Sequence, residues 1–220
     1  MAVLIKNMDM SKTCDGCFFY DDISRYCDAA NRRLYKIDQP KPRWCPIEEV
    51  KTMASNVEGK KDITVWILDH LPEDGTVLDV GACDGVWAKF LLSLDPDIII
   101  DGVEAYELNV IMHNLKRFYR NVYTMDVADL EYDWYDFIIF GDVIEHMTVE
   151  KAQRVLKYAW DRCDDMIVAV PYMYPQDAIY GNPWEIHKQP DLTPENFDER
   201  YPGFEPLWQN DFYGYYHKRR

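Results

Sequence analysis

Short runs of apolar residues alternate with amphipathic stretches from about residue 60 to residue 170. Apolar runs of this length predict buried strands, and the stretches between them have the spacing of helices. We predict strands at residues 76–80, 98–103, 122–124, 136–140 and 166–170, and helices at residues 86–94, 107–119 and 149–160. Because continuous apolar strands alternate with helices, the pattern indicates a parallel sheet covered on both faces.

The chain after residue 170 departs from this alternation. A Pro-rich stretch from Tyr172 to Pro194 indicates a loop over an active site, and residues 204–208 and 212–216 predict a closing antiparallel pair. The prediction is an α/β, doubly wound, seven-stranded sheet, mostly parallel with an antiparallel last strand. Residues 51–220 form this domain, and residues 1–50 form a separate Cys-rich module.

Composition and charge narrow the function classes. The 24 basic and 39 acidic residues give a formal charge of −15, spread along the chain, so nucleic acid is not a favoured partner. No window approaches the ~18 apolar residues of a membrane span, and the start lacks the features of a secretory signal. We expect a cytoplasmic protein with no membrane partner, and the oligomeric state stays open.

The most informative segment is the turn after the first predicted strand, which reads V-L-D-V-G-A-C-D-G-V-W from Val77. Gly81 and Gly85 let the backbone approach a ligand closely, and the helix that follows favours negative charge at its N-terminus. Glu104 stands nineteen residues after Gly85, at the end of the second strand, where an acid accepts hydrogen bonds from ribose hydroxyls. Asp126 follows the third strand and is placed to bind an adenine amino group, with the Val127 amide available to the ring.

With this ordered set of residues, the chain resembles the class I S-adenosylmethionine-dependent methyltransferases over about residues 60–220. The resemblance implies a Rossmann-like fold, S-adenosylmethionine as cofactor and an enzyme that transfers a methyl group. The residues it assigns to the cofactor are Asp79, Gly81, Ala82, Cys83, Gly85, Glu104, Asp126, Val127 and Gly141. Cys83 stands where that family has its middle glycine. A nicotinamide dehydrogenase fits less well, because Cys83 and Ala88 occupy the second and third glycine positions of its fingerprint.

The segment G-D-V-I-E-H after the fourth strand faces the acceptor, because ligands lie beyond the carboxyl ends of strands in such sheets. It is not the Asn-Pro-Pro-Tyr type of motif, so methylation of adenine N6 in DNA is disfavoured. Asp142, Glu145 and His146 lie within five residues, and His187 follows the fifth strand. This arrangement resembles metal-assisted O-methyltransferases of small-RNA 3′ ends, where such residues hold a divalent ion, and ubiquinone-pathway O-methyltransferases. Mg²⁺, Mn²⁺ and Zn²⁺ suit these ligands.

The alternative without metal is that Glu145 and His146 cap the next helix and line the site. His146 or His187 would then act as the general base, since an unperturbed imidazole titrates near ~6.5.

The N-terminal module carries four cysteines, Cys14, Cys17, Cys27 and Cys45, spaced C-x₂-C-x₉-C-x₁₇-C. Four thiolates with one close pair predict a structural Zn²⁺ site, and metal binding would stabilise a short segment that lacks a core. The alternative is four buried or incidental thiols.

We therefore predict O-methylation of a small-molecule or sugar hydroxyl, with Asp142, Glu145, His146 and His187 around the acceptor. One alternative is a metal-assisted RNA 2′-O-methyltransferase, which the acidic charge disfavours. Another is a catalytically silent S-adenosylmethionine-binding adaptor, whose zinc module recruits a partner.

Overall fold

The computed structural model describes residues 59–179 and 181–220, together with the backbone of five short strands nearer the N-terminus. These strands are β1 (Val3–Ile5), β2 (Tyr20–Asp21), β3 (Tyr26–Cys27), β4 (Arg32–Arg33) and β5 (Ile47–Glu49). The chain separates into two compact units, Met1–Ala54 and Ser55–Arg220. In the first unit β1 pairs in parallel with β5, and β2, β3 and β4 form an antiparallel sheet.

The predicted zinc site lies outside the residues whose side chains the structure describes. Cys14, Cys17 and Cys45 fall outside the described ranges, and Cys27 belongs to β3, of which only the backbone is described.

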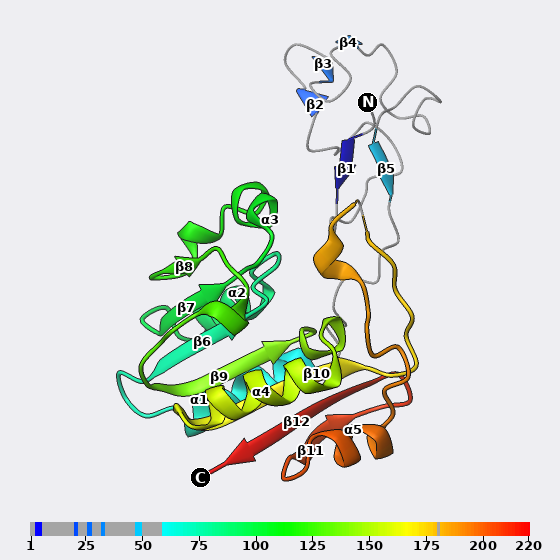
Figure 1. The fold of residues 1–220 in the computed structure, drawn as a ribbon. Helices are drawn as coiled ribbons and strands as arrows, with labels where there is room; N and C mark the ends of the chain where they lie inside the picture. Colours follow the sequence, from blue (N-terminus) through cyan, green and yellow to red (C-terminus); the bar gives the residue numbers. More distant parts are fainter. Residues whose placement is uncertain are drawn as a thin grey trace. The chain divides into compact units, whose positions relative to one another are not determined.

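The second unit is built on a seven-stranded sheet with the order β11-β12-β10-β9-β6-β7-β8 (Figure 1). Its strands are β6 (Thr76–Val80), β7 (Ile99–Val103), β8 (Val122–Tyr123), β9 (Tyr135–Gly141), β10 (Cys163–Pro171), β11 (Glu205–Gln209) and β12 (Tyr213–Arg219). Strands β6 to β10 pair in parallel, whereas β12 runs antiparallel to both β10 and β11. The α/β class, the seven-stranded sheet and its antiparallel last strand are confirmed.

Helices cover both faces of this sheet, as Figure 1 shows for α1 and α4. The helices are α1 (Lys60–His70), α2 (Val86–Leu94), α3 (Glu107–Met112), α4 (Val149–Trp160) and α5 (Pro194–Arg200). Alternate residues of β9 enter different cores: Ile138 and Phe140 pack on the side of α4 and α5, and Phe137 and Ile139 on the side of α1 and α2. A strand buried on both faces has to be apolar at successive positions, which explains the unbroken hydrophobic runs.

The structure corrects the predicted helix over residues 107–119. Helix α3 ends at Met112, Asn114 adopts a left-handed conformation with φ of 48°, and a 3₁₀ turn over Leu115–Arg117 follows. Asparagine is among the few residues that adopt this conformation at low cost, so the chain turns there although its apolar spacing continues.

Helices α1 and α5 were not predicted. Helix α5 begins with Thr193 as N-cap, whose hydroxyl accepts a hydrogen bond from the Asn196 amide at 3.1 Å, and with Pro194 in its first turn. These start signals fit a helix, but the surrounding loop composition obscured them. In the described part of the chain no helix is both long and apolar enough to cross a membrane.

Candidate active site

Three residues with positive φ shape the turn between β6 and α2. Gly81 and Gly85 have φ of 75°, and Cys83 between them has φ of 46°. A Cβ on Gly81 would overlap the Val143 side chain, so the turn needs glycine there. Cys83 holds a left-handed conformation that favours glycine. Cys83, which stands where the resembled family has a glycine, therefore adopts this backbone conformation at some cost in conformational energy.

Gly81 and Ala82 were predicted to contact the cofactor, and their backbone amides are the groups that could do so. In the structure both donate to the carbonyl of Val103, at 2.8 and 2.9 Å. They tie the turn to the end of β7 and fix its path at the edge of the sheet.

Glu104, directly after β7, is joined to the glycine turn. Its carboxylate accepts hydrogen bonds from the amides of Cys83 at 2.7 Å and Tyr106 at 2.8 Å. Burial raises the pKa of Glu104, and these two amides oppose that rise. A carboxylate has about four acceptor positions, so the one held here keeps capacity for hydroxyl donors.

Asp126 follows β8 and caps the 3₁₀ turn over Val127–Asp129. Its Oδ1 accepts from the Ala128 amide at 3.0 Å, and its Oδ2 pairs with Nζ of Lys151 in α4 at 2.5 Å. The acid is therefore held by two elements, and Val127 beside it is buried.

Two other residues assigned to the cofactor lie within the buried sheet. Asp79 in β6 is fully buried and accepts a hydrogen bond from the Tyr119 hydroxyl. Gly141 ends β9, and a Cβ there would overlap Nε1 of Trp87 in the first turn of α2. Gly141 thus makes room for the Trp87 indole.

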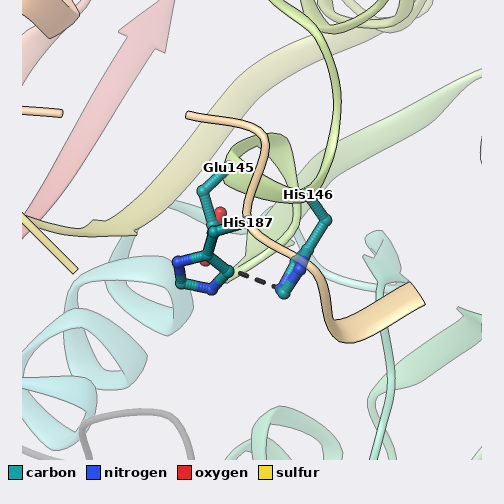
Figure 2. A group of neighbouring side chains, drawn as sticks. All are labelled: Glu145, His146 and His187. Carbon is teal, nitrogen blue, oxygen red and sulfur yellow. Dashed lines mark ion pairs between the residues drawn. The ribbon is translucent and has the colours of Figure 1, made fainter. Parts of the chain in front are cut away.

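Glu145, His146 and His187 form one cluster, drawn in Figure 2. Their ligand atoms all lie within 4.8 Å of one another, and Nε2 of His146 is 3.9 Å from Oε1 of Glu145. Neither Glu145 oxygen nor Nδ1 of His146 has a hydrogen-bond partner among the described residues. One carboxylate and two imidazoles at this spacing fit a divalent cation.

Backbone hydrogen bonds bring His187 to the cluster across more than forty residues of chain. The amides of Lys188 and Gln189 donate to the Glu145 carbonyl at 2.8 and 3.1 Å. His187 is oriented in turn by its Nδ1, which lies 2.6 Å from the Tyr174 carbonyl. The Pro-rich loop therefore supplies one of the three clustered side chains.

Burial disfavours the charged form of each of these three groups. It raises the pKa of Glu145 well above its usual range, and the nearby charge of Asp142 raises it further. Burial and then the neighbouring His187 lower the pKa of His146 to about 4, and burial also lowers the pKa of His187. Neutral imidazoles bind metals and accept protons, so the cluster suits either role.

Asp142 lies outside this cluster, although it was predicted with it. Its Oδ2 is 3.6 Å from Nζ of Lys60, and its Oδ1 accepts a hydrogen bond from the Tyr213 hydroxyl. Asp142 has a φ of 58°, a backbone conformation that is unusual outside glycine.

Sequence reasoning missed Lys60, Trp87 and Tyr213. Lys60 is adjacent to Lys61 in a stretch where no helix was predicted, and nothing in the sequence distinguishes the buried lysine from the exposed one. Tyr213 lies in a predicted strand, but its pairing with Asp142 depends on the register of β12 against β10.

Comparisons with solved structures bear on the fold. Magnesium protoporphyrin IX methyltransferase from Synechocystis PCC 6803, with bound SAH, has a TM-score of 0.54 at 16% identity, covering 74% of this chain and 82% of that chain. The N-terminal domain of EvdMO1, solved in the presence of SAH and D-fucose, has a TM-score of 0.57 at 14% identity, with coverages of 80% and 86%. This chain has the methyltransferase fold.

Human N-acetylserotonin methyltransferase in complex with SAM shares the fold too, with a TM-score of 0.54 at 16% identity, over 74% of this chain and 52% of that chain. No family model matches the chain, and the comparison with curated proteins found no match.

Proposed function

We propose that the unit Ser55–Arg220 is an S-adenosylmethionine-dependent O-methyltransferase that acts on a hydroxyl of a small molecule or sugar. The observation that carries the proposal is the hydrogen-bonded junction of Glu104 with the glycine turn at the carboxyl edge of the sheet. Two structural neighbours with this fold are methyltransferases, one solved with bound SAH and the other in complex with SAM.

The bound cofactor would supply an electrophilic methyl group. Glu104 would accept hydrogen bonds from the ribose hydroxyls, and Asp126 would face the adenine end. The glycine turn would receive the amino-acid end, because Gly81 and Gly85 let the backbone approach a ligand closely.

His146 and His187 are the groups best suited to handle the proton of an acceptor hydroxyl. Because burial lowers the pKa of His146 to about 4, its imidazole is unprotonated at neutral pH and can accept that proton. The methyl donor is already activated, so correct placement of the acceptor supplies much of the rate.

We further propose that Glu145, His146 and His187 hold a divalent cation. Their unpartnered atoms and close spacing support this. Such an ion would lower the pKa of an acceptor hydroxyl at the site. For the N-terminal unit, the spacing of Cys14, Cys17, Cys27 and Cys45 supports the proposal of a structural zinc site.

The function is tested in two steps. Calorimetry should first show that the protein binds SAH. Methyl-labelled S-adenosylmethionine is then offered with a panel of sugars, phenols and other small hydroxyl compounds, and we expect label in at least one of them. His146→Gln should abolish most of this transfer, whereas the matched variant His70→Gln, in α1, should leave it unchanged.

Absence of SAH binding would contradict the proposed function. Binding without transfer to any acceptor would instead favour the adaptor.

A further inference from the structure

Lys60 is a buried lysine whose charge has incomplete compensation. Its side chain is 0% exposed, and its Nζ makes no hydrogen bond to any described residue. Asp142 lies 3.6 Å away, and the ring centroids of Trp87 and Tyr215 lie at 4.9 and 5.9 Å. Because burying an ammonium group is unfavourable unless it is fully paired, an apolar side chain would pack at this position with less cost. The buried Lys60 therefore suggests that the neighbouring Asp142 carboxylate has a function beyond packing.

Asp142 is held at both of its oxygens. Tyr213 donates to Oδ1, and Lys60 lies opposite Oδ2, which has no hydrogen-bond partner in the described part of the chain. The Asp142 side chain is 18% exposed, in contrast to the lysine. Two buried groups thus fix the direction of a carboxylate that keeps acceptor capacity, on a side chain that as a whole remains partly exposed.

The place of Asp142 in the sheet relates it to the glycine turn. Asp142 directly follows β9, which pairs with β6 up to Val80 and Phe140. A Cβ on Gly81 would lie 3.8 Å from the carbonyl oxygen of Gly141. The fixed carboxylate and the turn therefore lie at the same edge of two neighbouring strands.

We propose that Asp142 accepts hydrogen bonds from the α-ammonium group of the cofactor, and that Lys60 and Tyr213 are positioning residues for its carboxylate. This inference rests on the proposed function, which brings the amino-acid end of S-adenosylmethionine to the glycine turn. The α-ammonium group would form a charge-assisted hydrogen bond with the Asp142 carboxylate. Lys60 would keep this carboxylate in one orientation.

The test compares two ligands that differ in the group concerned. SAH carries the amino-acid end, and 5′-methylthioadenosine keeps the adenosine and sulfur but lacks that end. Calorimetry is carried out on wild type, Lys60→Met and the matched control Lys61→Met, which changes an exposed lysine in the same turn of α1. We expect Lys60→Met to weaken SAH binding about tenfold to hundredfold and to leave methylthioadenosine binding unchanged. Lys61→Met should change neither, and Lys60→Arg should restore most of the SAH affinity.

Equal weakening of both ligands by Lys60→Met would show a general structural role and overturn the proposal, as would unchanged SAH affinity. If wild type binds neither ligand, the proposed function fails, and this inference with it. Wild-type binding of both ligands with no selective loss overturns the inference alone. If thermal unfolding shows that Lys60→Met is not folded, Asp142→Asn replaces it, with the same selective loss expected.

Discussion

The hydroxyl of Tyr119 donates a hydrogen bond of 2.5 Å to Oδ2 of Asp79, forty residues away in the sequence. Asp79 is fully buried in β6, and its Oδ1 has no partner among the described residues. Burial raises the pKa of Asp79 from its usual 3.8 to about 7, against the opposing effects of the Tyr119 hydrogen bond and the charge of Lys60. The folded chain therefore keeps a proton on Asp79 that the unfolded chain releases.

This relationship predicts a pH-dependent loss of stability. As pH rises from about 4 to about 7, the unfolded state loses the Asp79 proton first, so this group progressively destabilises the folded state. The full rise in pKa corresponds to a free energy of about 4 kcal/mol. Asp79→Asn lacks the titration, so its free energy of unfolding relative to wild type should increase over this range. Urea denaturation at several pH values measures it, and parallel wild-type and mutant profiles would contradict it.

Glu104→Gln should weaken SAH binding by about tenfold to hundredfold. The amide nitrogen of glutamine cannot accept hydrogen bonds. The variant therefore keeps only one acceptor oxygen for the two backbone amides and for a ribose hydroxyl. Calorimetry measures the change. Glu107→Gln, which alters an exposed acid in α3, is the matched control and should bind SAH normally. The ribose assignment is wrong if both variants bind alike.

A divalent cation should bind at the Glu145–His146–His187 cluster, with Mn²⁺ as the probe. Glu145→Gln and His187→Gln should each lower the Mn²⁺ affinity by at least about tenfold, because each removes a ligand atom. Burial raises the pKa of Glu145, and a bound ligand must be ionised. The affinity should therefore increase with pH as that proton is released. Calorimetry measures the Mn²⁺ affinity, with His70→Gln as the control. If Mn²⁺ bound only to surface groups, all of these variants would have the same affinity.

Gly141→Ala should destabilise the domain by about 1–3 kcal/mol, because the added methyl group would overlap Nε1 of Trp87. Trp87→Phe removes that atom, so the double variant should recover part of the loss. Urea denaturation of both single variants and the double variant measures the coupling. If the free-energy changes of the two single variants simply add in the double variant, the added methyl group and the Trp87 indole are not in contact.

Purified protein should contain about one zinc ion per chain, bound by the cysteines of the N-terminal unit. Cys14→Ser with Cys17→Ser removes the close pair and should release the metal. Elemental analysis measures it, and Cys163→Ser, which changes a buried thiol in β10, is the control that should keep the zinc. A zinc-free wild type would refute the site.

The sequence alone determined the sheet and most of what lies along its edge. Strands buried on both faces need unbroken apolar runs, so β6, β9 and β10 were visible, and Gly81, Gly85 and Glu104 were found because strand ends in such a sheet meet at one edge. Local signals failed where a single residue redirected the chain, as at Asn114 after α3, and where helices α1 and α5 went unpredicted.

Only the tertiary structure decided which side chains meet. The buried pair of Lys60 and Asp142 joins α1 to the end of β9, and His187 reaches Glu145 through backbone hydrogen bonds across a loop. Periodicity describes which side of an element is buried, but not which residue of a distant element lies opposite. That depends on strand register, on loop closure and on the electrostatic cost of each buried charge, which exist only once the chain is folded.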